Sequence, residues 1–135
     1  MKNILFIAIT ALTITSCHES FDERCQREAK EYTEKNCPRE VEPGNYLDST
    51  TYNIDTKTYH YWYTLSGRLD TPEAMQQMSA QKANIKNTLK ESLINSVDLK
   101  SCKDKGIDFV YTYYSKSKGV KVLEIRFTKD DYSAS

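Results

Sequence analysis

Apolar and polar positions recur along the chain with two different periods, and these periods predict its elements. In residues 21–35 the apolar side chains recur at steps of three and four, which is typical of an amphipathic helix. The residue before a proline avoids the helical conformation, so Pro38 predicts that this helix ends near Cys37. The run 70–73 supplies a capping side chain, a proline and an acidic residue, and predicts a second helix over residues 72–100.

Four stretches rich in β-branched and aromatic residues predict strands. They are residues 46–55, 58–67, 109–114 and 120–127. A polar turn at 55–57 joins the first two stretches and a loop at 115–119 joins the last two, so we expect two hairpins. The order α-β-β-α-β-β predicts an α+β fold of two layers, in which a four-stranded antiparallel sheet carries both helices on one face.

The N-terminal segment differs from the rest of the chain. Lys2 precedes an uncharged apolar run over residues 4–14, which is too short for the roughly twenty helical residues that span a bilayer. We therefore interpret residues 1–16 as a signal peptide, residues 17–20 as a short tether and residues 21–135 as a single domain.

The residues around Cys17 carry a resemblance. Ile14-Thr15-Ser16-Cys17 resembles the lipobox of bacterial lipoproteins, in which the cysteine is acylated and becomes the new N-terminus. This implies a lipid anchor without a transmembrane helix. By resemblance to enterobacterial lipoproteins, in which Asp at this position signals inner-membrane retention, His18 favours the outer membrane. The membrane leaflet stays open. The alternative is a soluble secretory signal in which Cys17 is incidental.

Charge and composition exclude several classes of protein. The chain has 39% hydrophobic and 28% charged residues, with 19 basic against 19 acidic side chains. These values exclude collagen-like, low-complexity and polybasic nucleic-acid-binding proteins. Cleavage after residue 16 removes Lys2 and leaves 18 basic residues against 19 acidic ones, so no electrostatic partner is implied.

Three cysteines remain if Cys17 carries lipid. Cys25 and Cys37 would stand roughly 18 Å apart on a helix, too far for a disulfide. Cys37 and Cys102 each follow a predicted helix, so we predict a Cys37–Cys102 disulfide and a buried Cys25 thiol. A metal site is not expected, because the chain has no C-x-x-C spacing and only His18 and His60 to add.

Short motifs along the mature chain carry a second resemblance. They are residues 36–38, 47–49, 59–65, 93–95 and 106–113. Together with Cys102 they resemble a family of small exported bacterial proteins of uncharacterised function. The resemblance supports the Cys37–Cys102 pairing and implies no activity, and this chain departs from the pattern by carrying Cys25 and a lipobox.

Candidate chemistry is sparse. The chain has no nucleophile elbow, zinc-protease motif, P-loop or dinucleotide fingerprint. His60 is the one conventional base of the predicted domain, so we expect neither an enzyme nor a cofactor.

Tyrosine is abundant, with ten residues. Because side chains alternate along a strand, Tyr59, Tyr61 and Tyr63 share one face, whereas His60 and Trp62 share the other. The candidate binding residues are Tyr59, His60, Tyr61, Trp62, Tyr63, Tyr111 and Tyr113.

These residues predict a non-catalytic binding module on the cell envelope. An aromatic sheet face or the hairpin loops would hold a protein or a glycan, with an inhibitor or immunity role as a related form. This hypothesis predicts a contiguous apolar patch around Trp62. The alternative is a structural envelope lipoprotein with no discrete ligand site, whose tyrosines cover a solvent-facing sheet.

Overall fold

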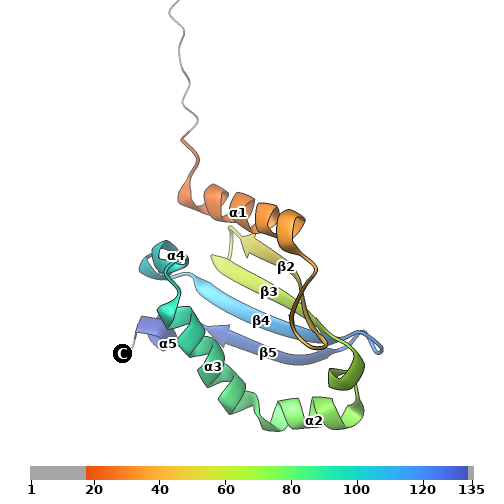
Figure 1. The fold of residues 1–135 in the computed structure, drawn as a ribbon. Coiled ribbons are helices and arrows are strands. Elements are labelled where there is room, and N and C mark those ends of the chain that lie inside the picture. The colour runs from red at the N-terminus through yellow and green to blue at the C-terminus, as the bar shows by residue number, and fades with distance from the viewer. Residues whose placement is uncertain (1–17, 134–135) are drawn as a thin grey trace, which may run out of the picture.

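The computed structural model describes residues 18–133 and has one five-stranded mixed sheet with helices packed on it (Figure 1). The elements are α1 (Phe21–Asn36), β1 (Arg39–Glu42), β2 (Asn45–Asn53), β3 (Thr58–Leu65), the 3-10 helix η1 (Gly67–Leu69), α2 (Pro72–Ala80), α3 (Lys82–Asn95), α4 (Lys100–Asp104), β4 (Asp108–Ser115), β5 (Lys121–Phe127) and α5 (Lys129–Ser133). The predicted α+β class is confirmed. The predicted signal peptide and Cys17 lie outside the described residues.

The start of α1 follows from its sequence. The Ser20 hydroxyl accepts a hydrogen bond from the Glu23 backbone N–H at 3.1 Å, and the Glu23 carboxylate accepts one from the Ser20 N–H at 3.1 Å. This capping box satisfies two of the N–H groups that a helix start leaves unpaired. Cys25 and Ala29 form the buried face of α1, which packs on β2.

The sheet has the strand order β1-β2-β3-β4-β5. The two predicted hairpins, β2 with β3 and β4 with β5, are antiparallel and confirmed. The predicted all-antiparallel pairing is wrong, because β3 and β4 are parallel. The helical segment between these strands returns the chain to the end of the sheet at which β3 began, so β4 runs in the same direction as β3.

The predicted number of strands is also wrong, because β1 is a fifth strand at the edge of the sheet. All four of its side chains are exposed. Its sequence therefore lacks the alternation of apolar and polar residues by which a half-buried strand is recognised.

The single helix predicted over residues 72–100 is wrong, because the structure divides this stretch into α2, α3 and α4. Gln81 leaves the helical conformation with φ −93° and ψ 11°, and Ser96 is extended. These breaks change the direction of the chain, so that α2 and α3 can both pack against β5.

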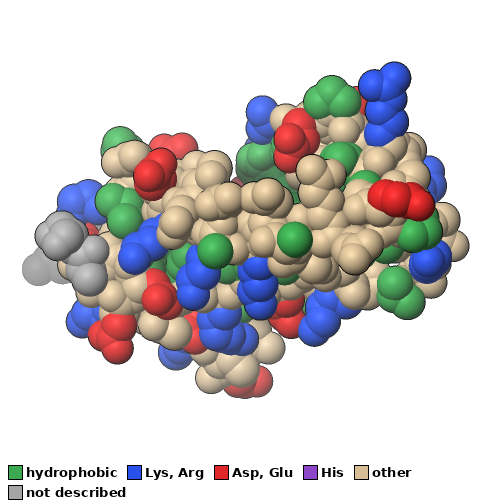
Figure 2. All heavy atoms as spheres, turned by 90° about the horizontal axis from the view of Figure 1, so that it is seen from below, with side chains coloured by type: hydrophobic (Ala, Val, Ile, Leu, Met, Phe, Trp, Pro, Cys, Tyr) green, Lys and Arg blue, Asp and Glu red, His purple; other side chains and the backbone are tan. Residues whose placement is uncertain are grey.

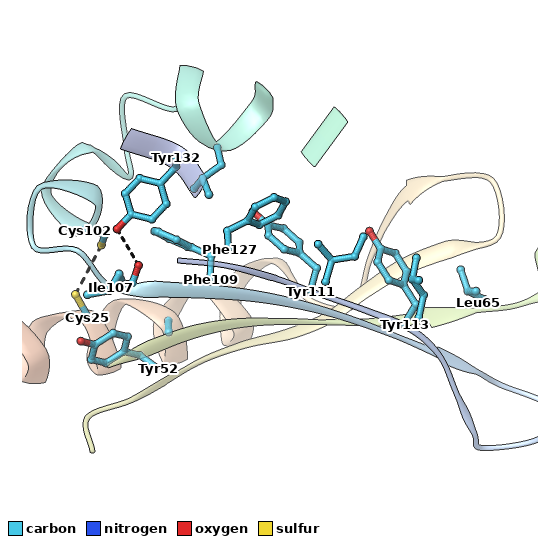
Figure 3. Close-up of a cluster of buried hydrophobic side chains, with 14 residues drawn as sticks. Cys25, Tyr52, Leu65, Cys102, Ile107, Phe109, Tyr111, Tyr113, Phe127 and Tyr132 are labelled. Atoms are coloured by element: carbon cyan, nitrogen blue, oxygen red, sulfur yellow. Dashed lines mark hydrogen bonds between the residues drawn. The ribbon is translucent and has the colours of Figure 1, made fainter. Parts of the chain in front are cut away.

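Side chains on the helix side of the sheet form the core (Figure 3). Phe109 and Phe127 are fully buried, and the rings of Phe127 and Tyr111 meet edge to face at 5.8 Å. Leu93 of α3 and Cys102 of α4 pack into the same cluster. Phe109 and Tyr111 share this face because alternate residues of a strand point the same way.

The outer surface near α2 and α3 has mixed charge. Figure 2 shows Lys and Arg side chains beside Asp and Glu side chains across the face seen from below. A surface of this kind does not attract a ligand of one particular charge. Among residues 18–133, no helix has the length and apolar character needed to cross a membrane.

Candidate functional site: a tyrosine-floored groove

The helix side of β3 and β4 is lined by tyrosine rings. The parallel register places Tyr61 beside Tyr111 and Tyr63 beside Tyr113. Their rings stack with centroids 4.8 Å and 4.6 Å apart. The ring of Tyr59 lies 5.3 Å from that of Tyr61. We call these five tyrosines the tyrosine floor.

The helices pack along the two sides of this face, and their side chains reach over β4, where Phe109 and Tyr111 are 0% and 6% exposed. α1 packs on β2, whereas α2 and α3 pack on β5. Figure 1 shows the same arrangement, with α1 along one side of the sheet, α3 along the other, and β3 and β4 between them.

A hollow opens at each end of the tyrosine floor. The first, of about 350 Å³, lies between α1 and the segment around α4, with Tyr59 and Tyr61 in its lining. The second, of about 290 Å³, is lined by Met78 of α2, Ile85 of α3 and Tyr113. Tyr59 and Tyr61 thus border one hollow and Tyr113 borders the other. We refer to the two hollows and the tyrosine floor between them as the tyrosine-floored groove.

The floor combines buried rings with accessible hydroxyls. Tyr111 and Tyr113 are only 6% and 5% exposed, while Tyr61 and Tyr63 are half-buried. Within residues 18–133, the hydroxyls of these four tyrosines have no hydrogen-bond partner, yet none of the hydroxyls is fully buried. Because these hydroxyls are accessible and have no partner within the protein, each can bond to water or to a ligand in the groove.

The protonation state of the floor follows from its burial. Desolvation raises the pKa of Tyr59 and Tyr63 to about 12 and holds the pKa of Tyr61 well above its ordinary value. All three phenols are neutral at pH 7, so each hydroxyl can both donate and accept a hydrogen bond.

Asn45 adds an unpaired acceptor beside the second hollow. Its Nδ2 donates to Glu42 Oε1 at 3.0 Å, which sets the orientation of the amide. Its Oδ1 is buried and has no donor within the described residues. Asn45 is 4% exposed and belongs to the lining of the hollow, so a donor at that wall would relieve an unsatisfied acceptor.

The opposite face of the sheet, which we call the open face, carries His60 and Trp62. Their rings stack at 3.6 Å, and the Trp62 indole N–H donates to Thr51 Oγ1 at 3.0 Å. His60 Nε2 lies 2.7 Å from Thr112 Oγ1, which donates to Glu124 Oε1 at 3.2 Å. The polar groups of this face thus bond to one another.

Trp62, around which an apolar patch was predicted, is not one of the exposed large apolar side chains of residues 18–133. Trp62 is half-buried among hydrogen-bonded polar side chains. The large apolar side chains exposed among residues 18–133 belong to other segments. They are Val41, Ile94, Val97 and Val120. The open face therefore has the character of a solvated sheet surface.

The structure separates the candidate binding residues that the sequence identified. Tyr59, Tyr61, Tyr63, Tyr111 and Tyr113 come together on the tyrosine floor, while His60 and Trp62 lie on the open face. Sequence reasoning missed Asn45 and Met78. Asn45 on β2 and Met78 on α2 are far apart in the sequence and meet only in the lining of the second hollow, so no local pattern marks them.

The predicted Cys37–Cys102 pairing is corrected by the structure. Cys25, Cys37 and Cys102 are free thiols, and Cys102 Sγ lies 3.9 Å from Cys25 Sγ. The prediction assumed two helices side by side with their C-terminal ends together. Instead, α4 follows the break after α3 and lies against the first half of α1. In residues 18–133, no group of three or more potential ligands is placed to hold a metal ion.

Comparisons with known proteins identify one family and two solved structures with a similar fold. A family model with the description "Domain of unknown function (DUF8479)" matches residues 20–123. A protein from Pseudomonas aeruginosa, described as secreted, has a similar structure with a TM-score of 0.70 and 13% identity over 82% of this chain and 91% of its own. A pilotin from the type 2 secretion system of Vibrio vulnificus has a TM-score of 0.58 and 8% identity over 84% and 93%. No curated protein matches by sequence.

Proposed function

The chain belongs to the family "Domain of unknown function (DUF8479)", and for this member we propose the role of an envelope lipoprotein that binds a polypeptide segment of a partner protein in the tyrosine-floored groove. The observation that carries the proposal is the set of unpaired hydroxyls on the tyrosine floor. Its rings supply apolar contact area with few degrees of freedom, and its hydroxyls supply hydrogen bonds.

Two further observations support a polypeptide ligand. The hollows at the ends of the groove have volumes of about 350 Å³ and 290 Å³, so each is large enough to admit an apolar side chain. One solved structure with a similar fold is a pilotin of a secretion system, and this favours a partner in the cell envelope. In a structural lipoprotein without a ligand site, these hydroxyls would bond to water alone.

We propose that Cys17 carries the lipid anchor. Only three residues separate Cys17 from the start of α1 at Phe21. A lipid on Cys17 would therefore hold α1, which forms one wall of the groove, close to the bilayer surface.

The anchor is tested by mass spectrometry of the full chain expressed with its leader in a bacterium. We expect the mature N-terminal peptide to begin at an acylated Cys17. A Cys17→Ala variant is expected to leave the membrane fraction or to retain its leader. A mature chain that begins at another residue, or an unmodified Cys17, would contradict the anchor.

The groove is tested by photo-cross-linking in cells that naturally make the protein. A benzophenone amino acid replaces Tyr63 in the groove and, in a matched control, Tyr114, which is half-buried near Trp62 on the open face. We expect the Tyr63 position to cross-link to one envelope protein and the Tyr114 position not to do so. Cross-links from Tyr114 alone, to a glycan alone, or from neither position would contradict the proposal.

The contribution of the hydroxyls is measured with a peptide that spans the cross-linked segment. We expect Tyr61→Phe with Tyr63→Phe to weaken its binding to the purified full chain at least about five-fold, because each lost hydrogen bond costs about 1 kcal/mol. Tyr114→Phe is expected to leave the affinity unchanged. The rings remain in every variant, so the fold is preserved.

A further inference from the structure

Two cysteines from distant parts of the chain meet in the core. Cys25 lies on α1 and Cys102 on α4, and their sulfur atoms are 3.9 Å apart (Figure 3). The side chains are buried, with residue exposures of 2% and 6%. The S–S bond of a disulfide is about 2 Å long, so the two sulfur atoms would have to approach each other by about 2 Å to form one.

A disulfide between Cys25 and Cys102 would join two helices that pack on different elements of the fold. α1 packs on β2, while α4 packs on α5, so the two helices belong to different parts of the fold. A neighbouring contact joins α1 to Lys105, the residue after α4, whose ammonium lies 5.7 Å from the centre of the Phe21 ring. A covalent bond at Cys25 would tie the first helix of the domain to the segment that follows α3.

We propose that Cys25 and Cys102 form a disulfide in the exported protein. The oxidant is a disulfide-bonded molecule of the envelope, such as a thiol–disulfide oxidoreductase. One cysteine, as a thiolate, attacks a sulfur of that disulfide, breaks its S–S bond and releases one thiol. The second cysteine loses its proton and attacks the mixed disulfide, which forms the Cys25–Cys102 bond and releases the second thiol of the oxidant.

Cys25 and Cys102 both belong to the lining of the first hollow, so a reagent would approach the pair from there. Burial raises the pKa of Cys25 to about 12 and also raises the pKa of Cys102. Both groups are thus protonated at neutral pH, and we expect oxidation of the folded dithiol to become faster as the pH rises.

Cys37 provides a matched control within the same chain. It is a partly exposed free thiol just after the C-terminal end of α1. Twelve residues of helix separate it from Cys25, which corresponds to about 18 Å. It therefore shares the compartment and the oxidant of the other two cysteines without sharing their geometry.

Peptide mapping identifies the bonded pair. The full chain, expressed with its leader, is denatured in N-ethylmaleimide and digested with trypsin without reduction. Each cysteine falls on a separate short peptide, namely residues 25–27, 36–39 and 101–103. We expect the first and third peptides to be linked and Cys37 to carry the label. Label on all three cysteines, or Cys37 linked to either other cysteine, would overturn the proposal.

A second measurement does not depend on mapping. Reduction of the wild-type chain with dithiothreitol is expected to lower the midpoint of thermal unfolding by about 10 °C, because the bond closes a long loop. Cys37→Ala should show the same shift, and Cys25→Ala with Cys102→Ala should show none. Equal midpoints of the wild type with and without reductant would contradict the bond. These results are independent of ligand binding in the groove.

Discussion

Replacement of Phe109 by alanine is expected to lower the free energy of unfolding by about 3–5 kcal/mol. Phe109 is 0% exposed and lies on β4, where its ring meets Tyr132 edge to face at 5.7 Å. It also lies 6.3 Å from the ring of Tyr59, so the cavity would extend toward the tyrosine floor. Denaturation of the purified chain in urea, followed by circular dichroism, measures the change.

The control for Phe109→Ala is Val120→Ala. Val120 is 49% exposed and lies between β4 and β5, so its truncation removes little buried surface. We expect a change within about 0.5 kcal/mol for this variant. A loss below about 1 kcal/mol for Phe109→Ala would show that the helix side of β4 is not the centre of the core.

Replacement of Gly44 by alanine is expected to cost at least about 2 kcal/mol of stability. Gly44 connects β1 to β2 with φ +82°, a conformation that favours glycine. An added Cβ would lie 2.6 Å from the backbone oxygen of Ser66, and the Ser66 N–H donates to the Gly44 oxygen at 2.8 Å. The backbone would have to move beside Leu69, which lines the second hollow.

Gly119→Ala distinguishes the cost of the left-handed backbone conformation from the cost of the steric contact. Gly119 also has a left-handed φ of +64°, but no atom lies within 4 Å of its added Cβ. We expect it to cost about 1 kcal/mol, which is the conformational part alone. The same urea titration compares the two variants. Equal losses would show that the contact between Gly44 and Ser66 does not restrict the backbone.

Local patterns predicted the elements well where one face of an element is buried. The apolar residues of α1 recur at helical spacing because Cys25 and Ala29 pack on the sheet. The alternation in β3 placed Tyr61 and Trp62 on opposite faces, as the structure has them. β1 was not predicted, because none of its side chains is buried and its sequence therefore shows no apolar face.

Contacts between distant residues could not be predicted in this way. The break at Gln81 and the extended Ser96 lie within a stretch whose apolar periodicity is compatible with one continuous helix. Packing on β5 decided where that stretch divides, and the divided segment placed α4 against α1. For this reason the partner of Cys102 in the structure is Cys25 and not Cys37.

The amino-acid sequence by itself determined the α+β class, the two hairpins and the separation of β3 into two faces, because each depends on the spacing of neighbouring residues. Only the tertiary structure decided the parallel pairing of β3 with β4, which brings Tyr61 and Tyr63 beside Tyr111 and Tyr113. It also decided which face of β3 lies between the helices. Both depend on where the intervening helical segment returns the chain to the sheet, and no local pattern encodes that path.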